Sequence, residues 1–212
     1  MRRWTKELLF DLREPGINIW ILPIISAVFV VGSCLLQAEL GNNNTMTLAM
    51  LEIVIPFMGG YASIMIMQGL LDTEGCEILF TYPRSYLYWG ILRESRLFVV
   101  QAIHVAIISR CLSEIMQISF WEIFALTLFQ SFAVMGISFF GVSISRKVSI
   151  GLIVLIAFVG IQITIGRELN LLNWIFVLSG RIPSYAVMTG ICVRSVCIGV
   201  FGWIVGQMWI HP

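Results

Sequence analysis

The sequence predicts an all-α integral membrane protein with six transmembrane helices. The chain of 212 residues is 58% apolar and only 12% charged, whereas soluble domains carry about 25% charged residues. Six segments each offer about 20 mainly apolar residues, the length needed to cross a bilayer. The links between them are short, so we expect one transmembrane domain over residues 1–212 and no separate soluble domain.

The expected spans follow the hydropathy of the chain. Their approximate ranges, in order, are 17–37, 47–71, 97–117, 120–145, 148–166 and 185–209. Pro56 is expected to kink or loosen the second span. Gly202 and Gly206 form a Gly-x-x-x-Gly pair in the sixth span, which indicates close helix packing.

An amphipathic surface helix is expected over residues 2–14, before the first span. Trp4, Leu8 and Leu12 recur every four residues and would line one helical face. The apolar run that follows is longer than the 7–15-residue core typical of a signal peptide. We therefore expect it to be retained as the first span.

Basic residues predict the orientation, because they concentrate on the cytoplasmic side of membrane proteins. With a cytoplasmic N-terminus, the outer links hold only Arg167 and Arg181. The inner side then holds nine of the 13 basic residues: Arg2, Arg3, Lys6, Arg13, Arg84, Arg93, Arg96, Arg146 and Lys147. Both termini are therefore expected in the cytoplasm.

The longest polar interruption is segment 72–85, between spans two and three. Asp72 suits a helix N-cap, and Glu74 and Glu77 lie where acidic residues favour a helix N-terminus. Pro83 would end such a helix. The sequence therefore predicts a short cytoplasmic helix here.

A second irregular segment, 167–184, precedes the sixth span on the expected outer side. Its apolar run 174–178 is too short to cross a bilayer. It is flanked by charged residues, which favours a re-entrant or interfacial helix.

Four ionisable residues fall inside the expected spans, where charges are unfavourable and usually face protein or water. They are His104, Arg110, Glu114 and Arg194. The spacing of Arg110 and Glu114 allows them to pair on one helical face. Two interpretations stay open: structural pairs near the membrane edge, or residues lining a substrate path. Glu52 and Glu122 are interpreted as residues at the membrane interface.

The sequence lacks the motifs of several kinds of catalytic and binding site. No phosphate-binding Gly-x-x-x-x-Gly-Lys motif and no His-Glu-x-x-His motif occurs, so neither nucleotide binding by that loop nor a zinc protease of that type is expected. The five cysteines have no metal-ligand spacing. The sequence has no basic cluster of the kind that would indicate nucleic-acid binding.

Segment 72–85 carries a family resemblance. Asp72-Thr73-Glu74-Gly75-Cys76-Glu77-Ile78-Leu79, followed by Tyr82-Pro83-Arg84-Ser85, resembles the cytoplasmic loop of ABC transporter permeases of the type-2 exporter class. Those permeases often carry acid-x-Glu-Gly-Thr-x-Glu-Leu-Leu and then Pro-x-Ser-Arg. Cys76 stands beside the position where threonine is frequent, and Arg84-Ser85 replaces the commoner order. The six spans, the surface helix and the outer segment resemble the same class.

The resemblance implies a role for this loop as a coupling helix that docks on a separate ABC ATPase subunit. The residues carried over are Asp72, Glu74, Gly75, Glu77, Pro83 and Arg84. It also implies that ATP and Mg²⁺ bind to the partner ATPase and not to this chain. A second permease subunit, identical or related, would complete the path in a bacterial plasma membrane, and export is implied only by the family.

Two other functions remain open. A six-span substrate-capture component of an ATP-driven importer would need a pocket near the outer face and no coupling helix. An intramembrane protease would need a serine and a histidine that meet. Gly136-Ile137-Ser138 and Gly141-Val142-Ser143 match the serine half only, and small residues on a helix face favour packing. The cargo is not determined by the sequence.

Overall fold

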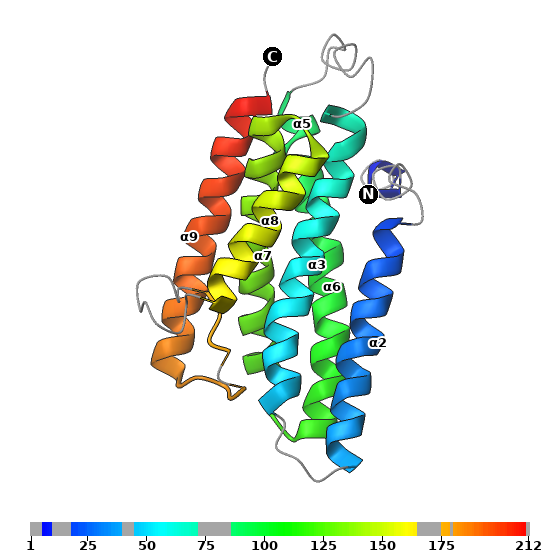
Figure 1. The fold of residues 1–212 in the computed structure, drawn as a ribbon, viewed down its shortest axis with the longest axis vertical. Coiled ribbons are helices and arrows are strands. Elements are labelled where there is room, and N and C mark those ends of the chain that lie inside the picture. Colours follow the sequence, from blue (N-terminus) through cyan, green and yellow to red (C-terminus); the bar gives the residue numbers. More distant parts are fainter. Residues whose placement is uncertain are drawn as a thin grey trace.

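The computed structural model describes residues 6–9, 18–39, 45–71, 86–164, 175–178 and 180–210. Its helices are α2 (Asn18–Glu39), α3 (Thr45–Leu71), α5 (Tyr86–Trp89), α6 (Ile91–Met116), α7 (Phe120–Ser145), α8 (Val148–Thr164) and α9 (Tyr185–Ile210). The long helices lie side by side in an elongated bundle (Figure 1). We call the end with α5 and the last turn of α9 the α5 end, and the opposite end, with the α6–α7 turn, the α6–α7 end.

Four of these helices, α3, α6, α7 and α9, are long and apolar enough to cross a membrane. The apolar parts of α2 and α8 are shorter, at 23–36 and 148–164. All expected spans except the third agree with a helix to within two residues at each end. Large apolar side chains such as Val28, Ile153 and Phe201 are exposed on the outside of the bundle, which fits a chain surrounded by lipid.

Helix α6 begins before the expected start of the third span, near residue 97. Helix α6 begins at Ile91, and the carbonyl of Gly90 accepts the first backbone hydrogen bonds, from Arg93 (2.9 Å) and Glu94 (3.1 Å). The sequence assigned these charged residues to the polar link. The structure instead buries their side chains inside the bundle, where they have partners on other parts of the chain.

Helix α7 lies at the centre of the bundle and packs against α3, α6, α8 and α9. Helices α7 and α9 cross with their backbones in close contact at glycine residues. A Cβ atom on Gly136 would lie 2.6 Å from the carbonyl oxygen of Gly199, and one on Gly202 would collide with the carbonyl oxygen of Gly136. Close packing at Gly202 was therefore predicted correctly. The aromatic ring of Phe132 packs beside this crossing against Trp203, with ring centroids 4.8 Å apart.

Two expected helices have a different outcome. Residues 6–9 are helical, and Leu8 packs against the core, while Trp4, Leu12 and the rest of the expected surface helix lie outside the described residues.

The expected helix over 174–178 is wrong for its described part, because residues 175–178 have no helical hydrogen bonding. Ile175 and Phe176 are nevertheless fully buried, so this segment belongs to the interior of the bundle.

Candidate functional site

A cluster of buried charges lies at the start of α6, at the α5 end. It consists of Arg93, Glu94 and Arg96, which we call the α6 cluster, and none of them is more than 3% exposed. Buried charges are strongly unfavourable unless they are paired and hydrogen-bonded. The partners of this cluster therefore determine how the end of the bundle is assembled.

The α6 cluster connects separate parts of the chain. The hydroxyl of Ser63 in α3 donates to Oε1 of Glu94 at 3.0 Å, and the carbonyl of Met135 in α7 lies 3.4 Å from the same hydroxyl. The guanidinium of Arg96 lies 3.6 Å from the carboxylate of Glu7. The first turn of α6 is thereby joined to α3 and to residues 6–9.

The junction of α5 and α6 is fixed against α9. Oε1 of Gln207 accepts a hydrogen bond of 2.7 Å from the backbone N–H of Ile91. A Cβ atom at Gly90 would collide with the Gln207 amide, so a larger residue there would displace this side chain and break its hydrogen bond to Ile91. Helix α9 therefore contacts the chain directly after residues 72–85.

The six residues expected to couple to an ATPase all fall in segment 72–85, outside the described residues. The structure describes the flanks of this segment: Leu71 at the end of α3 and Tyr86 at the start of α5. Both flanks lie at the α5 end (Figure 1), next to the α6 cluster. What the structure adds to the sequence prediction is the set of buried contacts made by the α6 cluster at this end of the bundle.

At the α6–α7 end, a second buried carboxylate holds the irregular segment 175–178. Oε2 of Glu52 in α3 accepts hydrogen bonds from the backbone N–H groups of Val177 (3.0 Å) and Leu178 (2.8 Å). Glu52 is only 4% exposed. Its interpretation as a simple interface residue is therefore wrong.

The same segment is also held by α7. Nε2 of Gln130 donates a 2.8 Å hydrogen bond to the carbonyl of Ile175. Leu178 has a left-handed backbone, with φ of 49°, a conformation that is uncommon for a residue with a Cβ atom. The two N–H groups that point to Glu52 thus come from an irregular, non-helical backbone.

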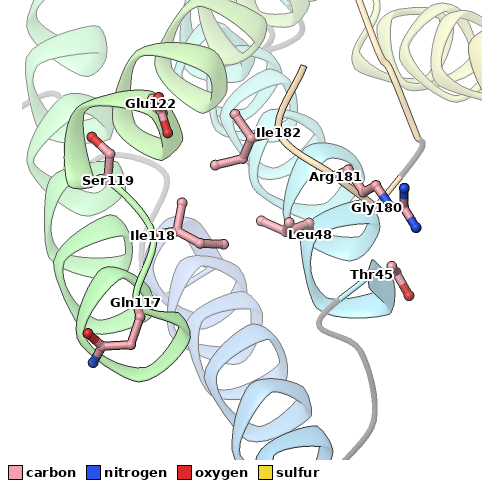
Figure 2. Close-up of a pocket in the computed structure, with 9 residues that line it drawn as sticks. All are labelled: Thr45, Leu48, Gln117, Ile118, Ser119, Glu122, Gly180, Arg181 and Ile182. Carbon is pink, nitrogen blue, oxygen red and sulfur yellow. The ribbon is translucent and has the colours of Figure 1, made fainter. Parts of the chain in front are cut away.

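A pocket of about 520 Å³ opens beside this segment. Figure 2 shows Leu48, Ile118 and Ile182 pointing towards its middle, with Glu122 and Ser119 on the α7 side. A cavity of only about 10 Å³ lies next to it, lined by Glu52, Thr127 and the shared residues Leu48 and Ile182. This smaller volume is enough for about one water molecule.

The ionisable residues predicted inside the spans do not form one site. Arg110 and Glu114 pair at 2.7 Å as expected, but both are largely exposed, at 68% and 63%. His104 lines a separate cavity of about 280 Å³ between α2 and α6. Arg194 is exposed on α9. Glu122, interpreted as an interface residue, is exposed on the rim of the open pocket.

Sequence reasoning missed the polar face of α3. Glu52, Gly59 and Ser63 recur at helical spacing and so lie on one face. A Cβ atom on Gly59 would lie 3.3 Å from the side-chain nitrogen of Gln101, which itself donates to the carbonyl of Ile55 at 3.3 Å. The spacing alone could have indicated this face, because a polar stripe on a lipid-embedded helix is expected to face protein.

Comparison of the chain with protein-family models, with curated proteins and with solved structures found no match. The helical fold and the two polar ends of the bundle are therefore the basis for the functional proposal.

Proposed function

We propose that this chain is the membrane subunit of an ATP-driven transporter, with segment 72–85 as the contact for a separate ATPase subunit. The observation that carries the proposal is the α6 cluster, which lies at the start of α6, close in sequence to the end of that segment. Its contacts reach α3 through Ser63 and residues 6–9 through Glu7. If the ATPase displaces segment 72–85, the movement would therefore reach several helices together.

The described basic residues support an orientation with the α5 end in the cytoplasm. Arg93, Arg96, Arg146 and Lys147 lie at the starts of α6 and α8, which are both at the α5 end (Figure 1). Basic residues favour the cytoplasmic side. In this orientation α2 and α8 complete six spans, both termini are cytoplasmic, and a second permease subunit forms the other half of the path.

In the same orientation, segment 175–178 enters the bundle from the outer side as a re-entrant segment. Its contacts with Glu52 and Gln130 close the space between α3 and α7 at that end. We infer that this segment is the outer closure of the transport path. The supporting fact is that its polar backbone groups are held by side chains of two different spans.

Purification of the tagged chain from its native membrane in mild detergent tests the proposal. An ATPase subunit should co-purify with the wild type and be lost from Glu74→Lys and Glu77→Lys. Glu122→Lys makes the same charge change at the exposed α6–α7 end and should retain the ATPase. Absence of any ATPase from repeated mild preparations, or its retention by both variants of segment 72–85, would refute the proposal.

One observation favours the substrate-capture component of an importer as a second candidate. The pocket of about 520 Å³ would open to the outside in the proposed orientation. A capture component should hold a small molecule in the absence of the ATPase, detectable by native mass spectrometry. Ile182→Trp would fill the pocket and remove that molecule, whereas an exporter subunit should carry no such ligand in either form.

A further inference from the structure

The small cavity between α3 and α7, of about 10 Å³, has the volume of about one water molecule or one small ion. Two buried polar side chains line it, Glu52 from α3 and Thr127 from α7. They are only 4% and 1% exposed. The other lining residues are aliphatic, apart from Arg181. An occupant of the cavity would therefore meet a carboxylate on one side and a hydroxyl group on the other.

Oxygen atoms at this cavity lack partners. Oγ1 of Thr127 forms no hydrogen bond among the described residues. The two hydrogen bonds to Glu52 both end on Oε2, which leaves Oε1 for another partner. Oε1 of Gln130, one turn further along the same face of α7, also has no partner in the described part of the chain. Oxygen atoms of both polar lining residues, and a third one turn away, are therefore available to a ligand.

The charge of Glu52 has no counter-ion in the part of the chain that the structure describes. No described arginine or lysine forms an ion pair with it. Figure 2 shows the guanidinium of Arg181 pointing away from the middle of the neighbouring pocket. The two backbone N–H groups stabilise the carboxylate but do not neutralise it. Since a buried charge is strongly unfavourable unless it is paired, a cation in the cavity would supply what the carboxylate lacks.

We propose that this cavity binds a sodium ion, with Oε1 of Glu52 and Oγ1 of Thr127 among its ligands. Oxygen ligands suit a hard cation, and one positive charge neutralises one carboxylate. Calcium takes about six to eight oxygen ligands and magnesium keeps several waters, so neither fits a volume of about one water molecule. The proposal does not depend on the transport function.

Binding of ²²Na⁺ to the purified protein in lipid nanodiscs tests the proposal. The wild type should bind the ion saturably, and unlabelled NaCl should displace it while choline chloride at the same ionic strength should not. Thr127→Val keeps the shape of the side chain but removes a ligand. It should weaken binding by at least about tenfold, because loss of a group that only supports a metal ligand already has an effect of about 10–100-fold. Thr189→Val is the matched control and should bind as the wild type does, since Thr189 is exposed on α9 and its hydroxyl donates to the carbonyl of Tyr185 in the same helix.

Thermal unfolding gives a second readout. A ligand that binds only the folded state stabilises it, so NaCl should raise the melting temperature of the wild type above its value in choline chloride, and this difference should be absent from Glu52→Leu. If Glu52→Leu does not fold, the comparison of Thr127→Val with Thr189→Val remains decisive. Absence of saturable ²²Na⁺ binding by the wild type would overturn the proposal and assign the cavity to a water molecule only. Unchanged binding by folded Thr127→Val and Glu52→Leu proteins would also overturn it.

Discussion

Replacement of Glu52 tests whether one buried carboxylate holds segment 175–178 in the bundle. Oε2 of this residue accepts the N–H groups of Val177 and Leu178 at 3.0 and 2.8 Å. A hydrogen bond between neutral groups contributes about 0.5–1.5 kcal/mol, and a buried group left without its partner costs about 1–3 kcal/mol. Glu52→Leu removes the acceptor of both bonds, so segment 175–178 should be destabilised by about 2 kcal/mol, whereas Glu52→Gln keeps the size and a carbonyl acceptor and should lose less.

This loss should appear as local opening of the segment. A difference of about 2 kcal/mol corresponds to an approximately 30-fold larger opening equilibrium. Where that equilibrium limits exchange, the amide hydrogens of Val177 and Leu178 should exchange about 30-fold faster in Glu52→Leu, and by a smaller factor in Glu52→Gln, which keeps an acceptor.

Hydrogen exchange measured by mass spectrometry on the protein in lipid nanodiscs gives this readout. Glu122→Gln is the matched control, because Glu122 lies on the rim of the neighbouring pocket and accepts no hydrogen bond from the described part of the segment. Unchanged exchange at 177 and 178 in a folded Glu52→Leu protein would show that apolar burial of Ile175 and Phe176, and not the carboxylate, holds the segment.

Three further predictions concern the bundle itself. Gly202→Leu should prevent folding or sharply lower the melting temperature in detergent, because its side chain has no room against Gly136; Gly190→Leu, where no atom lies within 4 Å of the added Cβ, should melt as the wild type does. Ser63→Ala removes the hydroxyl that donates to Glu94 and should destabilise the protein by about 0.5–1.5 kcal/mol, the net contribution of one hydrogen bond; a denaturant titration that shows no change would contradict the assigned contact. Arg110→Gln breaks an exposed pair between residues four apart and should change stability by less than about 0.5 kcal/mol, so a large loss in the same titration would indicate a hidden role for this arginine.

The helix ends were predictable where the sequence passes abruptly from apolar to polar residues. The start of α7 at Phe120 and the start of α9 at Tyr185 coincide with such boundaries. The start of α6 was not predictable in this way, because Arg93, Glu94 and Arg96 are locally indistinguishable from a solvated link. Their burial depends on Ser63 and Glu7, which are distant in the sequence. Local hydropathy carries no information about such partners.

Segment 175–178 was misjudged for a related reason. Its apolar residues indicated a short helix, and their burial was correctly implied by their composition. Their non-helical backbone depends on tertiary contacts, since the Gln130 amide donates to the carbonyl of Ile175 and Glu52 accepts hydrogen bonds from two N–H groups. A backbone without helical hydrogen bonds is tolerated in the interior only where such partners exist. The sequence therefore indicated the segment's place in the core but not its conformation.

The polar face of α3 connects these two results. Glu52 holds segment 175–178 at the α6–α7 end, and Ser63 holds Glu94 near the α5 end. Between them the Gln101 side chain binds the carbonyl of Ile55. Residues 52, 55, 59 and 63 fall within one side of a helix of 3.6 residues per turn. A rotation of α3 about its axis would therefore disturb contacts at both ends together, whereas a movement that keeps this face in register would preserve them. Because packed interiors deform little and transmit strain, α3 is the described helix through which the α6 cluster and segment 175–178 are mechanically linked.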